Sequence, residues 1–248
     1  MIVKAYKTSK VKPGDNLSKI LDRFLPKLKE NEIVFITSKI LSLSQSNVIK
    51  QDGKLTKVDL AKKESNYYLS EKYIKYGIRL TITNDTLIAS AGIDESNSNG
   101  YFVLWPSNPM EETKNIWKYL RRKFNLKNLG VVITDSHGMI LRKGLTGFGL
   151  AWCGFEPIKN YIGTPDIFGK ILKVSKTNLV DALSASAVLV MGEGREQTPL
   201  AVASDLPFIK FKIYPPSKEE IDEMHITIDT DIYSALLKSV PWERGHKR

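Results

Sequence analysis

Apolar side chains recur at helical spacing in several stretches of this 248-residue chain. Residues that can cap a helix stand before some of them, including Asn16, Asn108 and Ser217. The pattern predicts helices over residues 17–28, 109–124, 178–190 and 231–237, a short helix after Ser217, and a helix within the polar stretch 50–77.

Short apolar runs bounded by turn-forming residues alternate with these helical stretches. The predicted strands cover residues 33–37, 78–83, 86–90, 101–105, 129–134 and 199–203, and the Asn84-Asp85 turn joins two of them into a hairpin. No internal repeat or low-complexity linker interrupts the succession. At 42% hydrophobic content the chain can bury one large core or two small ones.

The formal net charge of +10 at pH 7 favours polyanionic partners, either nucleic acid or a phosphorylated small molecule. The positive residues are spread along the chain, and no aromatic residues interleave with glycines as they do in an RNA-binding sheet. A generally lysine-rich surface explains the charge more simply. Nucleic acid is therefore the weakest of the partner hypotheses.

Secretion and membrane insertion find no support in the sequence. The N-terminal residues lack the apolar core of a signal peptide, and the longest apolar run, residues 185–191, is too short to span a bilayer. The single cysteine, Cys153, provides neither a disulfide framework nor a cysteine-based zinc site, and its apolar surroundings predict a core position. We therefore expect a cytoplasmic protein.

Candidate chemistry first appears where the apolar run from Leu87 ends in Asp94, Glu95, Ser96 and Asn97. Taken alone, this stretch also fits a polar turn between two strands, because Gly, Asn, Asp and Ser are turn formers. The turn is the simpler interpretation of the stretch by itself, but the same residues place hard oxygen ligands at the end of a buried strand, as metal–phosphate chemistry commonly needs.

The predicted strand 129–134 repeats this event, because it runs directly into Asp135, Ser136, His137 and Gly138. Carboxylates delivered by separate strands can share one divalent cation or a pair, so Asp94 and Asp135 together favour a metal site. His137 could be a ligand or a base, although a lone histidine in a turn is more often incidental.

Two further stretches could meet a phosphate. Ser38 and Lys39 follow the predicted strand 33–37, where a structural surface lysine is an equal alternative. Residues 142–149 are basic and glycine-rich, so a loop there could approach phosphate closely, or could be a tight loop beside a packed sheet. Neither standard glycine-rich nucleotide signature occurs in the chain.

Eight short motifs of the chain, within roughly residues 8–204, occur in the same order as similar motifs of a known family. In these motifs the chain resembles the coenzyme F420-0:L-glutamate ligase family, the F420-0 gamma-glutamyl ligases. The segment Ala91 to Asn97 is the most specific. The motifs are Gly14-Asp15-Asn16-Leu17, Thr37-Ser38-Lys39, Ala91-Gly92-Ile93-Asp94-Glu95-Ser96-Asn97, Thr134-Asp135-Ser136-His137-Gly138, Arg142-Lys143-Gly144, Tyr161-Ile162-Gly163, Asp166-Ile167-Phe168-Gly169 and Val190-Met191-Gly192-Glu193.

The resemblance implies a fold and a reaction. The fold is α/β (α+β) with mixed sheets, two domains per chain and an intertwined homodimer with active sites at its interface. The reaction is GTP-dependent attachment of L-glutamate to the carboxylate of a cofactor precursor, F420-0 or a related acceptor such as a folate, through an acyl phosphate. Residues 1–214 would form the catalytic region and residues 215–248 a C-terminal helical extension.

The resemblance also implies roles for individual residues. Asp94 and Asp135 correspond to ligands of a first Mg or Mn ion, and Ser136 and Glu193 to ligands of a second. Lys39, with Asp94 and Asp135, would be catalytic. The positions expected to bind the nucleotide are Ser38, Lys39, Asn97, Met191, Gly192, Glu193, Gly194 and Arg195.

This chain departs from the family pattern at substrate positions. Leu43 and Gln45 stand where the family usually has a lysine and an acid, and Leu145 and Gly147 replace an amide and an acid. The departures suggest a different acceptor, and they motivate a second hypothesis of a non-catalytic nucleotide- or metabolite-binding protein on the same fold. A nucleic-acid-binding protein is the third.

Overall fold

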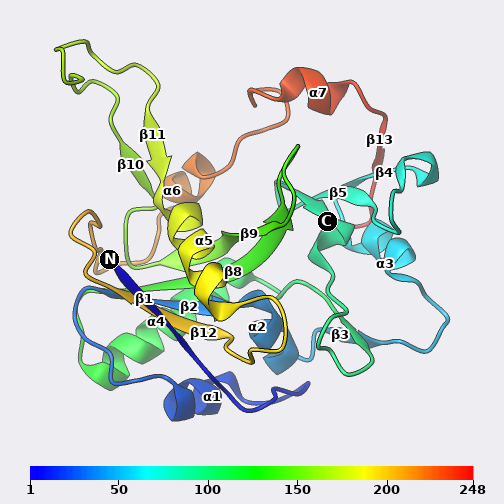
Figure 1. The fold of residues 1–248 in the computed structure, drawn as a ribbon, viewed down its shortest axis with the longest axis horizontal. Coiled ribbons are helices and arrows are strands. Elements are labelled where there is room, and N and C mark those ends of the chain that lie inside the picture. Colours follow the sequence, from blue (N-terminus) through cyan, green and yellow to red (C-terminus); the bar gives the residue numbers. More distant parts are fainter. Residues whose placement is uncertain (248) are drawn as a thin grey trace.

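The structure is a computed structural model that describes residues 1–247 (Figure 1). Its α-helices are α1 (Leu17–Phe24), α2 (Ser38–Ser44), α3 (Lys57–Glu64), α4 (Pro109–Phe124), α5 (Leu179–Met191), α6 (Lys218–Glu223) and α7 (Ser234–Lys238). Its strands are β1 (Ile2–Tyr6), β2 (Glu32–Thr37), β3 (Val48–Lys50), β4 (Tyr67–Leu69), β5 (Leu80–Thr83), β6 (Thr86–Ala89), β7 (Tyr101–Val103), β8 (Leu129–Gly138), β9 (Leu145–Cys153), β10 (Ile158–Asn160), β11 (Lys176–Asn178), β12 (Leu200–Ser204) and β13 (Trp242–Arg244).

The largest sheet has five strands in the order β1-β12-β2-β8-β9, and only β2 and β8 run parallel. Alternate residues of β2 enter different cores, because successive side chains of a strand point to opposite faces. Val34 and Ile36 pack with α1, α2 and α4, whereas Ile33 and Phe35 pack with α5. A strand covered on both faces is expected to be continuously apolar, as Ile33–Ile36 of β2 are.

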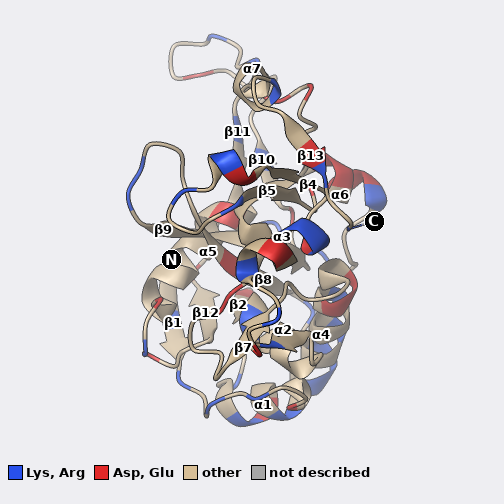
Figure 2. Cartoon of the chain, turned by 90° about the vertical axis from the view of Figure 1, so that its right-hand side faces the viewer, with Lys and Arg blue, Asp and Glu red and all other residues tan. Residues whose placement is uncertain are grey.

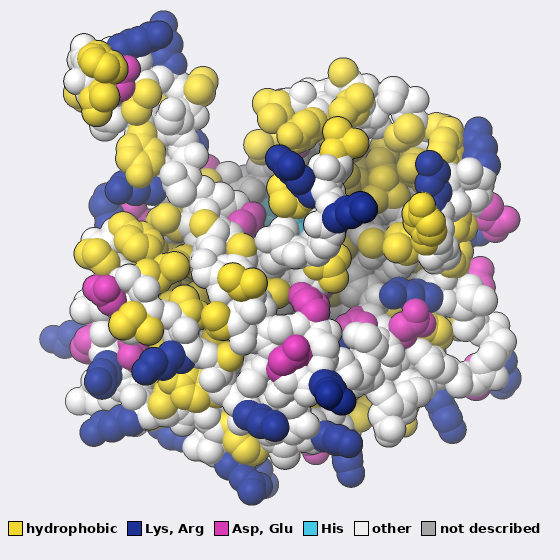
Figure 3. All heavy atoms as spheres, in the orientation of Figure 1, with side chains coloured by type: hydrophobic (Ala, Val, Ile, Leu, Met, Phe, Trp, Pro, Cys, Tyr) yellow, Lys and Arg dark blue, Asp and Glu magenta, His cyan; other side chains and the backbone are white. Residues whose placement is uncertain are grey.

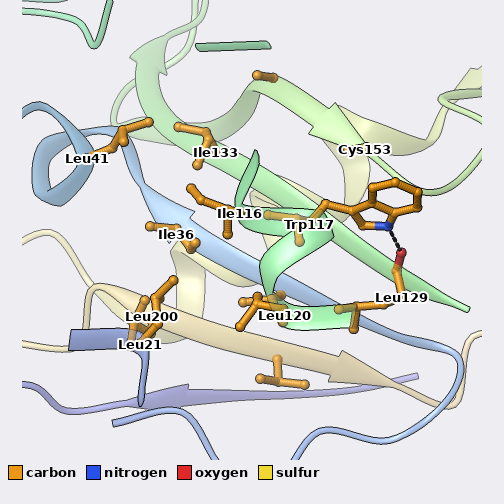
Figure 4. Close-up of a cluster of buried hydrophobic side chains, with 14 of the residues drawn as sticks. Leu21, Ile36, Leu41, Ile116, Trp117, Leu120, Leu129, Ile133, Cys153 and Leu200 are labelled. Carbon is orange, nitrogen blue, oxygen red and sulfur yellow. Dashed lines mark hydrogen bonds between the residues drawn. The ribbon is translucent and has the colours of Figure 1, made fainter. Parts of the chain in front are cut away.

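The core between this sheet and α4 is shown in Figure 4. Leu120 and Trp117 of α4 lie against sheet residues such as Ile133, and the Trp117 indole donates a hydrogen bond to the carbonyl oxygen of Leu129 at 2.7 Å. This bond satisfies the one polar atom of a large buried side chain, as is usual for buried tryptophans.

Smaller sheets flank the large one. Four strands in the order β13-β4-β5-β6 form one sheet, and β3 pairs with β7 in another. Strands β10 and β11 form a separate ribbon that projects from the body of the molecule (Figure 1). The chain is thus a mixed α/β protein with several sheets.

Most predicted elements are present with shifted ends. The helix predicted over 17–28 ends at Phe24, because Leu25 precedes Pro26 and a residue before proline avoids the helical conformation. Gly192 ends α5, as a glycine C-cap should. The predicted strands correspond to β2, β5, β6, β7, β8 and β12.

The prediction of a loop over residues 142–149 holds only for residues 142–144, because residues from Leu145 onward form β9. Gly147 and Gly149 face α5 rather than a phosphate: a Cβ at Gly147 would lie 2.5 Å from the carbonyl oxygen of Ser184, and one at Gly149 would lie 2.1 Å from Cγ1 of Val180. These glycines permit close packing of a helix on a strand, which local sequence cannot distinguish from a phosphate loop.

The segment after residue 214 contains α6, α7 and also β13, a strand that the helical expectation did not include. The end of the described chain is held in place, because the backbone N–H of Gly245 donates to the carbonyl oxygen of Asn66 and that of His246 to the carbonyl oxygen of Lys62. Arg248 lies outside the described residues. No helix within residues 1–247 has the length and apolar character needed to cross a membrane.

Candidate functional site

A cavity of about 740 Å³ opens beyond the carboxyl end of β2 and beside residues 134–136 of β8. Its walls come from segments that are distant in sequence: residues 8–12, 37–43, 92–99, 103–105, 134–136 and 188–199. Sheets with parallel neighbours commonly bind ligands in this position, because polar residues following the strands meet there.

The parallel register of β2 and β8 brings two predicted motifs together. Thr37 lies opposite Thr134, so Ser38 and Lys39 emerge beside Asp135. The pairing of β8 with β9 shifts between Ile133 and Thr134, immediately before this aspartate. Such irregularities re-aim side chains and are frequent next to active sites.

Asp94 reaches the same cavity from the segment between β6 and β7. Its backbone pairs with Val103, and its carboxylate Oδ1 accepts hydrogen bonds from the Ser96 backbone N–H at 2.7 Å and hydroxyl at 2.8 Å. Lys39 Nζ lies 2.6 Å from the other carboxylate oxygen. The polar turn considered from sequence is therefore present, and it points its acid at the lysine that follows β2.

The segment after α5 forms the opposite wall. The Asn97 side-chain amide donates to the carbonyl oxygen of Gly194 at 2.8 Å, which ties the Asp94 segment to this wall. The Ser136 hydroxyl donates to a Glu193 carboxylate oxygen at 3.3 Å. Met191, Gly192 and Arg195 also line the cavity, so all of the predicted site residues are brought together.

The pKa values of the acids in the site are shifted in different directions. Burial raises the pKa of Asp135 to about 6 against hydrogen bonds from Ser136 and Trp105, and the charge of Asp94 adds to the rise. Burial also raises the pKa of Glu193. For Asp94, burial acts in the same direction but is outweighed by Lys39 and Ser96, so its pKa is lowered. Perturbed acids gathered in a cleft are typical of functional sites.

The donor set fits a hard divalent cation bound together with a phosphate ligand. Within residues 1–247, no three Asp, Glu, His or Cys side chains are close enough to form a protein-only metal cage. Magnesium does not require one, because it usually takes one or two carboxylates and completes its shell with water and substrate phosphates. Asp94 with Asp135 could hold one such cation, and the Ser136 hydroxyl with Glu193 could hold another.

Some residues singled out from sequence lie elsewhere. His137 packs its ring edgewise on Phe148, with 4.9 Å between centroids, and burial lowers its pKa. Leu145 is 61% exposed outside the cavity. Among the departures from the family pattern, Leu43 is buried in the cavity wall, whereas Gln45 exchanges two hydrogen bonds with the backbone of Ser107.

Two parts of the site were missed by sequence reasoning. Trp105 lines the cavity and donates its indole N–H to Asp135, but the sequence places it only at the end of a strand. Residues 8–12 form a wall held by a backbone bond between Thr8 and Gln197 and another between Gly14 and Leu43. Lys10 and Lys12 on this wall make it basic, although nothing local signals a contact across so many residues.

A family model described as F420-0:Gamma-glutamyl ligase matches residues 5–205. The chain belongs to this family. The match includes every segment that lines the cavity, whereas α6, α7 and β13 lie beyond it.

Curated members of the F420-0:gamma-glutamyl ligase family resemble the chain over most of its length. The coenzyme F420:L-glutamate ligase of Methanosarcina barkeri is 28% identical over 242 residues, which cover 91% of each chain. That of Methanosarcina mazei is 28% identical over 79% of this chain and 82% of its own, and that of Methanocaldococcus jannaschii is 28% identical over 83% and 89%.

Proposed function

We propose that the protein is a GTP-dependent ligase that joins L-glutamate by an amide bond to a carboxylate of a cofactor precursor, coenzyme F420-0 or a related acceptor. The gathering of Asp94, Asp135, Ser136 and Glu193 with Lys39 in one cavity carries the proposal. The names of the curated relatives support the glutamate and the F420-type acceptor.

The reaction requires activation, because a free carboxylate does not condense readily with an amine. An acceptor carboxylate oxygen attacks the γ-phosphorus of GTP, and GDP leaves. The glutamate amine then attacks the carbonyl carbon of the acyl phosphate, inorganic phosphate leaves, and the amine loses a proton as the amide forms. One GTP is consumed for each amide bond.

Each predicted residue has a task in this scheme. Magnesium or manganese, when bound, neutralises the phosphates and aligns them for transfer. Asp94, Asp135, Ser136 and Glu193 would supply its oxygen ligands, at two sites as the family resemblance implies. Lys39 is positioned to stabilise negative charge on the moving phosphoryl group. Ser38, Asn97 and the residues from Met191 to Arg195 would contact the nucleotide.

The basic wall of the cavity is consistent with the proposal that the substrates are anions. Lys10 and Lys12 line the cavity, and neither forms an ion pair with another residue of the described chain. GTP, glutamate and a carboxylate acceptor are all anions, which such a wall attracts.

A coupled assay of GDP release with L-glutamate and F420-0 or folate acceptors tests the proposal. We expect release that depends on Mg²⁺ or Mn²⁺ and on the acceptor. Asp94→Asn and Asp135→Asn should each reduce kcat at least about 100-fold, since losing an electrostatic contact to the transition state costs about 2.7 kcal/mol or more. Asp85→Asn, in the exposed turn between β5 and β6, is the matched control. Full activity in either site variant contradicts the metal assignment.

Leu43 favours a second candidate function. It places an apolar side chain in the cavity wall, where the family resemblance leads us to expect a lysine. A non-catalytic nucleotide-binding protein would bind GTP in calorimetry and release no GDP with any acceptor. Steady acceptor-dependent release excludes this alternative.

A further inference from the structure

The carboxylate of Asp135 is held from more than one side. Its Oδ1 accepts the backbone N–H of Ser136 at 2.8 Å, and its Oδ2 accepts the indole Nε1–H of Trp105. A carboxylate offers about four acceptor positions, so these donors fix its plane and leave capacity for a cation.

Trp105 is a rigid donor because its ring is packed in place. The side chain is 5% exposed and shares a cluster with Ile88 and Phe148, whose ring centroid lies 6.2 Å from that of Trp105. Its main chain is fixed as well, since the side-chain amide of Asn47 donates to the Trp105 carbonyl oxygen. The indole N–H therefore has one direction, toward Asp135.

Gly92 leaves the space that the indole occupies. A Cβ built on Gly92 would lie 2.1 Å from Nε1 and 2.2 Å from Cε2 of Trp105, far inside any normal contact. Gly92 stands two residues before Asp94. The turn that brings Asp94 to the cavity thus also leaves room for Trp105, whose indole orients Asp135.

We propose that Trp105 is a positioning residue that holds the Asp135 carboxylate in the orientation required by a divalent cation. Position 92 is a glycine because a side chain there would occupy the space of this indole. The inference rests on the metal-dependent function proposed above. Hydrogen-bond partners behind a metal ligand typically change metal affinity by about 10-fold to 100-fold when removed.

A purely structural role predicts a different result. If Trp105 only filled the core, then phenylalanine, which keeps an aromatic ring and loses the N–H, would change stability without changing metal affinity. Trp117 provides the comparison. It is also buried and also donates its indole N–H, but to the backbone oxygen of Leu129 rather than to a site residue.

The test measures Mn²⁺ binding directly, by the electron paramagnetic resonance of free Mn²⁺, with thermal unfolding of each variant recorded in parallel. Trp105→Phe should bind Mn²⁺ at least about 10-fold more weakly than the unsubstituted protein, whereas Trp117→Phe should lose stability and keep the affinity. Equal affinities for Trp105→Phe and the unsubstituted protein overturn the proposal. Failure of the unsubstituted protein to bind Mn²⁺ both alone and with GDP present overturns the metal assignment itself.

Gly92→Ala tests the second half of the proposal. Its matched control is Gly100→Ala, because Gly100 has a comparable left-handed backbone (φ of 84°, against 71° for Gly92) but nothing within 4 Å of a built Cβ. We expect Gly92→Ala to weaken Mn²⁺ binding as Trp105→Phe does, and Gly100→Ala to leave it unchanged. Equal effects of the two alanines would show that backbone strain alone is responsible, which removes the role of Gly92.

Discussion

Asp135 and Cys153 lie on neighbouring strands, and burial has opposite consequences for their reactivity. At Asp135, nearby donors and the open cavity keep an acid available to a cation. At Cys153, the thiol lies in an apolar core with no exposed surface, and burial raises its pKa to about 12. The same desolvation therefore creates a functional group at one position and an inert one at the other.

The inert thiol gives a prediction at this scale. Because the thiolate is the reactive form and the pKa is raised, Cys153 should stay protonated throughout the range in which free cysteines react. Ellman's reagent at pH 8 should label almost none of the folded protein within minutes, and one thiol per chain after unfolding in guanidinium chloride. Rapid labelling of the folded protein contradicts the assigned burial.

Among the elements, the contact between β9 and α5 is set by glycine. Gly149→Ala places a Cβ 2.1 Å from a methyl group of Val180, so the helix must move or the strand must bend. We expect a loss of about 1–3 kcal/mol in the free energy of unfolding, measured in urea. Gly138→Ala is the matched control, since β8 leaves open space around that position. An equal loss in both variants would exclude overpacking as the cause.

The elements also show where sequence reasoning stops. Amphipathic α4 and apolar β2 and β8 are predictable because their patterns follow directly from burial. The acids Asp94 and Asp135 are found because each follows an apolar run in the sequence, although Asp94 lies in the segment between β6 and β7 and Asp135 lies within β8. By contrast, β9 is not predictable, because its glycines look like a loop and are explained only by their packing against α5. The wall at Lys10 and Lys12 is held by backbone hydrogen bonds to Gln197 and Leu43, which are distant in sequence. Contacts between distant segments leave no local pattern.

For the whole molecule, charge is distributed rather than gathered. Lys and Arg occur on most elements in Figure 2, and the basic residues with an evident task are those at the cavity. Apolar side chains are also exposed over much of the surface, and several of the most exposed lie on one ribbon. The ribbon of β10 and β11 and its connecting loop, which project at the upper left of Figure 3, expose Ile167, Phe168 and Val174 at 92%, 89% and 85%. Exposed apolar groups of this kind mark interaction sites.

We therefore predict that the homodimer implied by the family resemblance forms through this exposed apolar ribbon. Light scattering after size-exclusion chromatography should give twice the monomer mass. Replacing both Ile167 and Phe168 by Asp should halve it. Ile226→Asp with Ile232→Asp, also exposed but distant from the ribbon in sequence, should leave the dimer intact. A monomeric unsubstituted protein removes the prediction.

The order of strands in the large sheet determines how long β2 remains without a partner strand during synthesis. β2 is apolar on both faces, and its neighbours β8 and β12 begin at Leu129 and Leu200. At about 5–20 residues per second, this strand stays unpaired for roughly 5 s or more before its first neighbour emerges. Yield during expression should consequently depend on translation speed and on chaperones that cover β2, even for variants whose folded stability is unchanged.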